Sequence, residues 1–509
     1  MDWKLNLKTT GPKPKYRQLM DFINSAVASG RLKPGDRIPS VAELANRLSV
    51  NKATVVRAFR ELERQKLIVS QVGRGSFVAA RAPKSGEPAQ RDGDADDQAV
   101  LTRPEVVGLV RRLRDTHVSG VVQLLRVDPP KPFINLWAGV PPETTIPPGL
   151  LERAAVRASR HHREALYRYH HNGLPQLRER LAKWLATRGY DLAPDQILIT
   201  NGSQQAIGLI ATWALNEQRT AVVETPTYIG TPRLFMQTGT MLETVPWDGP
   251  QLRSDRLTRA VRASPSVVYC CPEFHNPTGQ CLSADGRAAL VDVAARWDAV
   301  VVVDDIFRDL RFAGKETPSL YVQLPPGRRV LVGSFSKTFM PGLRIGFLAA
   351  DRPLIEELAV IRRWMDLGGS PVTQAIMADL LENTYPGHLE TMRAHYRQRR
   401  DAARDALRSS MPDGVTFTVP DGGFSLWVQL PSGSSAIQVY LRALEQGVTI
   451  YPGPAHDIDG RYLNCFRLCY GWPSPDEIRR GVEILGRIVR ETLKRGPLDA
   501  TATGVGVPL

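Results

Sequence analysis

The sequence predicts an α/β protein in which a small helical domain precedes a large domain with a mostly parallel sheet. From about Asn135 onward, short β-branched runs alternate with longer stretches of helical periodicity, which is typical of such a sheet. The first 80 residues instead contain short amphipathic segments separated by turn signals. Between the two, residues 83–99 contain no aromatic, β-branched or leucine residue, and five of the seventeen are Asp or Glu. Such a segment buries too little apolar area to fold, so we expect a flexible tether.

These patterns divide the 509 residues into four parts. We expect a small domain at 1–80, a flexible acidic linker and lead-in at 81–130, a large domain at 131–493 and a disordered tail at 494–509. A chain of this length is too long for one hydrophobic core, which agrees with at least two folded domains.

Composition argues against a membrane or secreted protein. No apolar run approaches the roughly 18 residues of a membrane span. The first thirty residues are punctuated by Lys and Arg and lack the apolar segment of a secretory signal. The five cysteines include no Cys-x-x-Cys pair, which favours reduced thiols in a cytoplasmic protein. The pairs His161-His162 and His170-His171 lack the spacing of metal ligands, so no metal site is predicted.

Positive charge is concentrated near the start of the chain. The formal net charge is +14, and residues 1–80 contain 15 Lys and Arg against 6 Asp and Glu. Such asymmetry indicates a polyanionic partner for this part of the chain. A solvated basic surface is the alternative that charge alone leaves open.

The first 80 residues predict one longer helix and then two short helices joined by a tight turn. Apolar residues from Tyr16 to Val27 recur at helical spacing. Ser40 to Glu43 has the spacing of a capping box and opens a helix that ends near Leu48. Asn51 can cap the next helix, whose apolar face includes Phe59. This is the helix-turn-helix arrangement, which places a helix N-terminus in the major groove of DNA.

A predicted hairpin follows these helices. Leu67–Ser70 and Ser76–Val78 are short strand-like runs joined through Gly73-Arg74-Gly75, which makes a wing with an arginine at its tip. With this hairpin, residues 14–79 resemble the winged helix-turn-helix of the GntR family. The motifs that carry the resemblance lie at 30–40, 43–45, 54–58 and 73–78.

The GntR resemblance implies a double-stranded DNA operator as a partner. The DNA-binding residues that it implies are Arg37, Ser40, Arg47, Lys52, Thr54, Arg57 and Arg74. Thr54 and Arg57 would lie nearest the base edges, and the basic side chains would contact phosphates. For each of them, a solvated surface position is the alternative.

The large domain contains one stretch that suits a covalently bound cofactor. Residues 333–346 follow an apolar run and include Lys337, two serines and Arg344. Burial readily converts a lysine ammonium to the neutral amine, which condenses with an aldehyde to an imine. Serine hydroxyls and an arginine suit a phosphate group. An aldehyde combined with a phosphate indicates pyridoxal 5'-phosphate (PLP).

Six apolar runs predict the strands of the large domain. They are Ile197–Thr200, Ala221–Glu224, Val267–Cys271, Val300–Asp304, Val330–Ser334 and Ile345–Ala349. Polar residues follow several of these runs. Because ligand groups in parallel sheets gather at strand ends, those residues predict one shared site.

Each of these polar residues suits one part of the cofactor or its substrate. The turn at 201–205 contains a glycine and opens a helix, which favours a phosphate. Tyr228 can lie against a planar ring, Asn276 can hydrogen-bond a phenolic oxygen, and Asp304 can hold a pyridine nitrogen protonated. Arg467, in an apolar run, can bind a substrate carboxylate. Taken singly they are ambiguous: Asp304 also suits a helix cap, Arg467 a salt bridge and Tyr228 a core.

In their order along the chain, these features resemble the class I/II aminotransferases of PLP fold type I, across roughly residues 130–490. The resemblance implies a large domain with a mostly parallel sheet and a smaller C-terminal α+β domain. It makes Lys337 the catalytic lysine, which forms the imine and carries the proton, and Arg467 the substrate-binding residue. The implied cofactor-binding residues are Lys337, Asp304, Asn276, Tyr228, Ser203, Gln204, Ser334, Ser336, Arg344 and Tyr169. Tyr169 would reach the phosphate bound to the partner subunit, because these folds dimerise across the active site.

One position departs from that pattern. The family usually has a tyrosine shortly after the ring-nitrogen aspartate, with its hydroxyl on the ring oxygen. Here the run is Asp304-Asp305-Ile306-Phe307, so Phe307 takes that place without a hydroxyl. The loss should shift the pKa of the imine and slow catalysis, which favours a sensor over an efficient enzyme.

A GntR-type domain tethered to an aminotransferase-like domain resembles the MocR regulators. We therefore expect a PLP-dependent transcriptional regulator that senses an amino acid or amine through the Lys337 imine. The resemblance also implies a homodimer, possibly head-to-tail. A working aminotransferase that also binds DNA is the first alternative, with weak or vestigial turnover. A vestigial dimerisation module is the second alternative.

Overall fold

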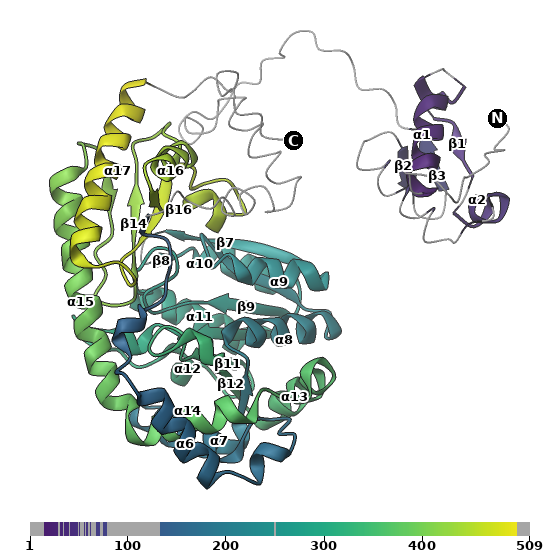
Figure 1. The fold of residues 1–509 in the computed structure, drawn as a ribbon. Helices are drawn as coiled ribbons and strands as arrows, with labels where there is room; N and C mark the ends of the chain where they lie inside the picture. The colour runs from purple at the N-terminus through teal and green to yellow at the C-terminus, as the bar shows by residue number, and fades with distance from the viewer. Residues whose placement is uncertain are drawn as a thin grey trace. The chain divides into compact units, whose positions relative to one another are not determined.

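The structure is a computed structural model in which the chain divides into two compact units, residues 1–95 and 96–509 (Figure 1). It describes residues 15–28, 31–33, 35–39, 41–48, 50, 55, 58, 59, 62, 68–71, 75–78, 133–248 and 251–495. The expected linker at 81–130 lies outside these residues, as do residues 496–509 of the expected tail. The first two residues of that tail instead complete the last helix, which ends at Arg495.

The N-terminal unit contains the predicted helices and hairpin. Its elements are α1 (Lys15–Ala28), β1 (Arg37–Ile38), α2 (Val41–Arg47), β2 (Ile68–Gln71) and β3 (Gly75–Val78). The three strands form an antiparallel sheet in the order β1-β3-β2. The described residues of the third predicted helix, Val55, Ala58, Phe59 and Leu62, are helical and buried. The apolar faces of the helices therefore form one small core, as the periodicity predicts.

An eight-stranded sheet forms the centre of the large unit. Its strands are β5 (Ile197–Thr200), β6 (Thr220–Thr225), β7 (Leu242–Asp248), β8 (Gln251–Leu252), β9 (Ser266–Cys270), β10 (Ala299–Asp304), β11 (Arg329–Ser334) and β12 (Gly346–Ala350). Their order is β5-β12-β11-β10-β9-β6-β7-β8. β12 is antiparallel to both of its neighbours and β8 to β7, whereas the other pairs are parallel.

All six predicted strands are present in this sheet. Only the run Ile197–Thr200 has both bounds right, and each of the other five differs from its strand by one residue at one or both ends. Two of the predicted runs extend past their strands, because β9 ends at Cys270 and β12 begins at Gly346. The Cys271 amide leaves the strand ladder and donates to the Glu224 carboxylate at 3.0 Å. β7 is missing from the prediction, since Glu243 and Pro246 interrupt its apolar pattern.

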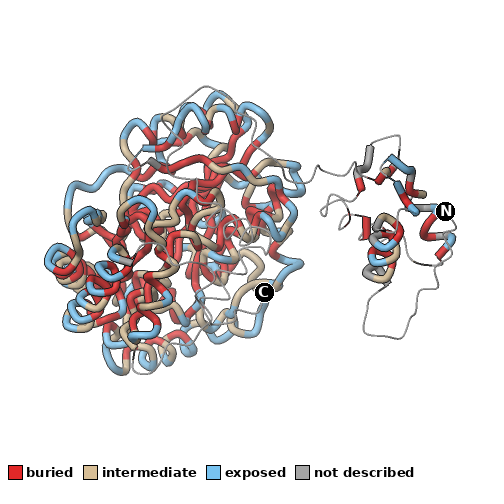
Figure 2. The backbone as a smooth tube through the Cα atoms, turned by 90° about the horizontal axis from the view of Figure 1, so that it is seen from above, coloured by how far each residue is buried: buried red, intermediate tan, exposed pale blue. Residues whose placement is uncertain are grey.

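Helices cover both faces of the sheet, whose strands are almost wholly buried (Figure 2). One face packs against α8 (Ser203–Asn216), α9 (Gly230–Thr238) and α13 (Arg352–Asp366). The other packs against α6 (Leu150–His161), α7 (Pro175–Thr187), α10 (Ser254–Ala263), α11 (Ala284–Arg296), α12 (Leu320–Gln323) and α14 (Pro371–Asn383). Burial on both faces explains why the strands are continuous apolar runs.

A smaller antiparallel sheet with its own core forms the C-terminal part. Its strands are β13 (Thr416–Phe417), β14 (Ser425–Gln429), β16 (Tyr451–Pro452) and β17 (Cys465–Cys469), in the order β13-β14-β17-β16. The helices α15 (Tyr385–Ser410), α16 (Ala436–Glu445) and α17 (Pro475–Arg495) pack around it, with α15 and α17 side by side (Figure 1). β4 (Ile134–Asn135) pairs in parallel with β15 (Val448–Thr449), which ties the start of the large unit to this part.

Short 3-10 helices complete the described elements. They are η1 (Glu143–Thr145), η2 (Ala165–Tyr167), η3 (Pro194–Gln196), η4 (Arg308–Leu310), η5 (Pro341–Leu343) and η6 (Gly453–His456). Within the described ranges, no helix combines the length and the apolar character that a membrane crossing requires.

Candidate functional site

The predicted site residues gather at one edge of the large sheet. The strands β5, β6, β9, β10 and β11 all run in the same direction, so their carboxyl ends meet at that edge. Ser203, Tyr228, Asn276, Asp304 and Lys337 lie at or just after the ends of these five strands. The structure therefore brings together residues that are spread over more than a hundred positions of the sequence.

Lys337 lies in the turn after β11 and is partly buried. Its Nζ donates to the Gly139 carbonyl at 2.7 Å and lies 5.6 Å from the centre of the Phe424 ring. Burial, and then the positive charge of Arg467, lower the pKa of Lys337 to about 8. The Tyr396 hydroxyl donates to the Lys337 carbonyl at 3.0 Å and holds the turn in place. A lysine in this state reaches the neutral amine near physiological pH and can attack a carbonyl carbon.

Asp304 ends β10 and is 2% exposed. Burial raises the pKa of its carboxyl to about 7. The Tyr269 hydroxyl donates to Oδ2, and the Ile306 amide donates to Oδ1 at 3.4 Å. A buried carboxylate of this kind is stabilised by a cationic partner, which a protonated ring nitrogen would provide. Tyr269 was missed by the sequence analysis, although a tyrosine in the otherwise apolar strand β9 was a usable signal.

The N-terminus of α8 and Arg344 form a cradle for an anion. Gly202, which precedes the helix, has a φ of +84°, and Arg344 has a φ of +55°. Arg344 Nη2 donates to the Asn201 carbonyl at 2.8 Å. A Cβ atom at residue 202 would lie only 2.7 Å from Arg344 Nη2, so only glycine leaves this approach open. Free amides at a helix N-terminus next to a guanidinium suit a phosphate.

The predicted serines and Tyr228 border the same cradle. Ser334 Oγ donates to Ser336 Oγ at 3.1 Å. It also lies 3.4 Å from the carbonyl oxygen of Ile345, the residue after Arg344. The Tyr228 hydroxyl donates to Gln204 Oε1 at 2.7 Å. Burial, and then the negative charge of Asp304, raise the pKa of Tyr228.

Arg467 lies in the centre of β17 and is 6% exposed. Its Nη1 donates to Asn276 Oδ1 at 2.7 Å, and its Nη2 donates to the Trp137 carbonyl at 3.1 Å. Its Nε is buried and has no hydrogen-bond partner among the described residues. The guanidinium also lies 4.7 Å from the centre of the Tyr451 ring. A buried arginine with an unsatisfied donor suits an anionic ligand. Trp137 and Tyr451 were not predicted, since neither lies in a recognisable motif.

Phe307 occupies the core beside the site. It is 1% exposed, and the centre of its ring lies 4.8 Å from that of Phe424. Phe307 therefore contributes only hydrocarbon to this part of the core. This arrangement agrees with the departure noted in the sequence.

Some predicted residues lie apart from this cluster or are not described. Tyr169 is 76% exposed on the surface. Arg47 is exposed at the end of α2, and for Arg37 the structure describes only the backbone, in β1. The remaining predicted DNA-binding residues, Ser40, Lys52, Thr54, Arg57 and Arg74, lie outside the described residues. The DNA contacts therefore stay predictions. Within the described part of the chain, no His, Cys, Asp and Glu side chains form a group that could hold a metal ion.

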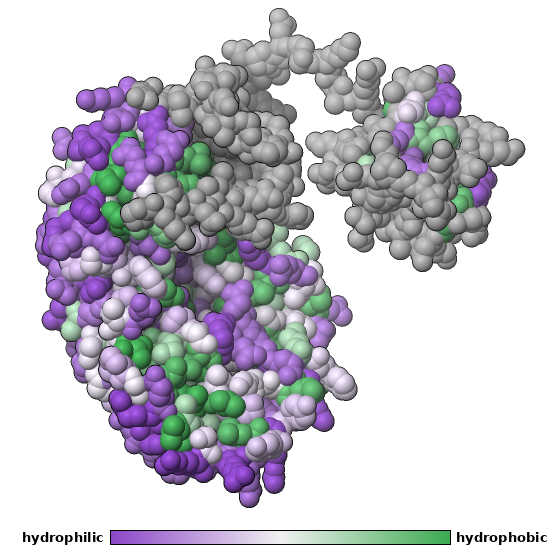
Figure 3. All heavy atoms as spheres, in the orientation of Figure 1, coloured by the Kyte–Doolittle hydropathy of each residue, from purple (hydrophilic) through white to green (hydrophobic). Residues whose placement is uncertain are grey.

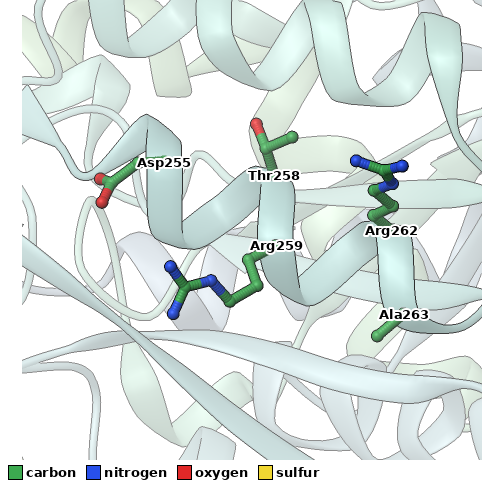
Figure 4. Close-up of a pocket in the computed structure, with 5 residues that line it drawn as sticks. All are labelled: Asp255, Thr258, Arg259, Arg262 and Ala263. Atoms are coloured by element: carbon green, nitrogen blue, oxygen red, sulfur yellow. The ribbon is translucent and has the colours of Figure 1, made fainter.

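A surface depression over α10 is unrelated to this site. Its lining residues, Asp255, Thr258, Arg259, Arg262 and Ala263, all project from that one helix (Figure 4). Arg262 lies over the ring of Trp297 at 5.7 Å. None of these residues is among those that the sequence analysis predicts for the site.

Two known families match this chain. Residues 131–485 match the family described as aminotransferase class I and II, and residues 15–78 match the family described as bacterial regulatory proteins, gntR family. The first match covers the large unit with the site, and the second covers the described elements of the N-terminal unit.

Similar proteins include both regulators and transaminases. An uncharacterized HTH-type transcriptional regulator, YdfD of Bacillus subtilis, is 29% identical over 95% of this chain and 98% of its own length. The probable rhizopine catabolism regulatory protein MocR of Rhizobium meliloti is 28% identical over 97% of this chain and 98% of its own. The 2-aminoadipate transaminase of Thermus thermophilus is 32% identical over 74% of this chain and 95% of its own.

Several solved structures similar to this chain are aminotransferases. The multiple substrate aminotransferase of Thermococcus profundus superposes with a TM-score of 0.68 at 30% identity, over 79% of this chain and 98% of that one. LysN of Thermus thermophilus, an α-aminoadipate aminotransferase solved with N-(5'-phosphopyridoxyl)-L-leucine, gives a TM-score of 0.67 at 29% identity, over 77% of this chain and 98% of that one.

Proposed function

This chain belongs to the aminotransferase class I and II family and is a MocR-type transcriptional regulator, and we propose that it senses an amino compound through PLP bound at Lys337. The observation that carries the proposal is the pairing of two shifted groups at one site. Lys337 has a pKa lowered to about 8, and the buried Asp304 has a pKa raised to about 7. Such opposed shifts at a strand-end site are typical of groups that act on a ligand.

The residues present fit PLP. Gly202 leaves open the approach to Arg344 that a phosphate needs, and the buried Asp304 carboxylate would pair with the ring nitrogen. When bound, PLP supplies an aldehyde carbon that amines attack and a ring that withdraws electrons. The residues that would hold its phosphate are Ser203, Gln204, Ser334, Ser336 and Arg344. Tyr228 would lie against its ring, and Asn276 would donate to its ring oxygen.

Arg467 suggests the chemical class of the effector. Its Nε is buried without a partner, while its other donors bind Asn276 and Trp137. A carboxylate is the acceptor that a guanidinium binds best. The effector would therefore be an amino acid, whose amino group meets the cofactor while its carboxylate meets Arg467. An amine without a carboxylate would bind more weakly.

We also propose that the protein acts as a head-to-tail homodimer and meets its effector and its DNA operator in the cytoplasm. Tyr167, Tyr169 and Trp364 are 85%, 76% and 82% exposed. His171 Nδ1 lies 2.9 Å from the Leu367 carbonyl, so the tyrosines and Trp364 belong to adjoining segments. Hydrophobic surface is also visible over α6, α7 and α14 (Figure 3). Exposed aromatic residues next to such a surface mark interaction sites, and a second copy would bring Tyr169 to the partner's phosphate.

The main alternative is a working aminotransferase that also binds DNA. It is supported by the presence of Lys337, Asp304 and Arg467 and by the similarity to transaminases. Against it stands Phe307, which brings no hydroxyl to the site. Repeated turnover with a 2-oxo acid would support the enzyme, whereas conversion of a single equivalent would support the sensor.

The experiment that tests the proposal is the visible absorption spectrum of the full-length protein with added PLP. The wild type should show the band of lysine-bound PLP, and Lys337→Ala should lack it. Lys315→Ala, at an exposed lysine away from the site, is the matched control and should keep the band. Amino acids should shift the wild-type band and change the affinity for operator DNA in a gel-shift titration. A wild type without a band would contradict both the sensor and the enzyme, and would leave a DNA-binding dimer with an aminotransferase fold.

A further inference from the structure

We propose that Asp366 is a positioning residue that aligns the two halves of the phosphate cradle, an inference that rests on the proposed binding of PLP. Asp366 is the last residue of α13 and belongs to no motif that the sequence analysis used. It would not touch the cofactor itself. Its role would be to hold the segment that does.

Four hydrogen bonds converge on the Asp366 carboxylate. Its Oδ2 accepts from Asn201 Nδ2 at 2.8 Å and from Gln205 Nε2 at 2.6 Å. Its Oδ1 accepts from the Gly368 amide at 2.9 Å and from Arg362 Nε at 3.3 Å. Burial tends to raise the pKa of Asp366, but the hydrogen bond from Gln205, with those from Gly368 and Arg362, leaves it below its ordinary value. The group is therefore an ionised acceptor at neutral pH.

Two of these donors lie at the entrance to α8. Asn201 immediately precedes Gly202, and Gln205 is in the first turn of the helix. The side-chain amides of both residues donate to the Asp366 carboxylate. In addition, the backbone N–H of Asn201 donates to Gln205 Oε1 at 2.8 Å, which joins the two residues. Without that carboxylate, the side-chain NH2 groups of Asn201 and Gln205 would both lose their acceptor. Asp366 thus determines where the backbone of Asn201 lies.

The backbone of Asn201 in turn places Arg344. The Asn201 carbonyl accepts from Arg344 Nη2 at 2.8 Å. Gly202 packs closely against Arg344, because a Cβ atom at residue 202 would lie 2.7 Å from Arg344 Nη2. Gly346 packs closely against Gly202 in the same way, because a Cβ atom at residue 346 would lie 2.6 Å from the Gly202 carbonyl carbon. With so little free space, a shift of Asn201 displaces the helix amides and the guanidinium together. A phosphate that must meet both sets of donors is sensitive to such a shift.

Arg362 explains how a carboxylate is tolerated close to an anion site. It is 0% exposed and forms an ion pair with Asp366, at 3.3 Å. A bare carboxylate next to the cradle would repel a phosphate. The paired arginine offsets that charge, so Asp366 can orient the amides without opposing the ligand.

The test compares PLP with pyridoxal, which lacks the phosphate, in titrations of full-length wild type and Asp366→Asn. The substitution removes the negative charge and replaces one of the two acceptor oxygens by an NH2 group, so that one pair of donors loses its acceptor. We expect the Kd for PLP to rise by about tenfold, the effect of losing one charge-assisted hydrogen bond. The Kd for pyridoxal should stay the same, because Lys337, Asp304 and Asn276 are unchanged. Inorganic phosphate alone should raise the melting temperature of the wild type but not that of the variant.

Asp298→Asn is the matched control. Asp298 forms ion pairs with Arg219 and Arg328 and directly precedes β10, at the opposite end of that strand from Asp304. Asp298→Asn should lower the stability of the folded protein without changing its preference for PLP over pyridoxal. Should Asp366→Asn fail to fold, Gln205→Ala removes one of the same contacts, and the same comparison applies.

The outcomes separate this inference from the proposed function. A wild type that binds no PLP overturns both. A wild type that binds PLP, with an Asp366→Asn variant of equal affinity, overturns only the role of Asp366. Equal losses for PLP and pyridoxal would show a general structural role and would also overturn it. A selective loss of PLP and phosphate binding supports it.

Discussion

Arg467 Nη1 donates to Asn276 Oδ1 at 2.7 Å, although the two residues are 191 positions apart. With its oxygen engaged, the Asn276 amide presents its NH2 group as a donor, which is what a ring oxygen requires. The group that would bind the effector carboxylate is therefore bonded directly to a group that would bind the cofactor. This contact links the two proposed ligands through one pair of side chains.

Replacing Arg467 should separate amino acids from simple amines. Arg467→Ala removes the partner of a carboxylate, so amino acids should bind about 10- to 100-fold more weakly, as expected for a charge-assisted hydrogen bond. Amines without a carboxylate should be affected much less. Titration of the absorption band with both ligand types measures this. Arg461→Ala, at a half-exposed arginine paired with Asp459, serves as the control. Equal losses for both ligand types would contradict a carboxylate-binding role.

Phe307→Tyr should restore the missing hydroxyl. A hydroxyl that donates to the ring oxygen stabilises the deprotonated form of lysine-bound PLP, so the pH midpoint of its absorption change should fall. Because Phe307 is 1% exposed, the added oxygen should also cost about 1–3 kcal/mol of stability through overpacking. A pH titration of the spectrum, with the melting temperature beside it, tests both effects. An unchanged midpoint would show that the position does not face the cofactor.

The stability of the protein without PLP should fall as the pH rises through the range set by Asp304. The folded carboxyl has a pKa of about 7, against an ordinary value of 3.8. Because the folded state holds the proton more tightly, its contribution is complete below pH ~4 and is lost as the pH approaches 7. The loss should be on the order of 4 kcal/mol at most, since each pKa unit corresponds to about 1.4 kcal/mol.

Chemical unfolding at several pH values checks this dependence. Asp304→Asn should flatten it, because the amide does not titrate. Bound PLP should flatten it as well, since its ring nitrogen offers a cation to the carboxylate. A slope that persists in Asp304→Asn would assign the effect to another group.

Gly202→Ala should weaken PLP binding through the cradle. The new Cβ would lie 2.7 Å from Arg344 Nη2, in a backbone with a φ of +84°. Gly189→Ala is a close control, because Gly189 has the same φ of +84° and a Cβ atom there would meet no other atom within 4 Å. Each alanine should cost about 1–2 kcal/mol of stability through backbone strain, but only Gly202→Ala should raise the Kd for PLP. Equal Kd values in the two variants would contradict the cradle.

Local patterns in the sequence were sufficient for many of the elements and for a set of candidate site residues. β-branched runs predicted six strands of the sheet, and helical spacing with turn signals predicted the N-terminal helices and hairpin. Lys337, Asp304, Asn276 and Arg467 could be proposed because each carries a functional group at a strand end or inside an apolar run. The predicted linker and most of the predicted DNA contacts concern residues that the structure does not describe, so they stay predictions.

The sequence by itself determined a set of candidate site residues and their order along the chain, because residue type and strand periodicity are local properties of the chain. The tertiary structure decided how those groups act on one another. Only the fold shows that Tyr269 donates to Asp304 and that the Asn201 side chain donates to Asp366. These contacts depend on which strands lie side by side and on how α13 packs against α8 and one face of the sheet. Neither is encoded in the spacing of residues along a single segment, because both result from the packing of elements far apart in the chain.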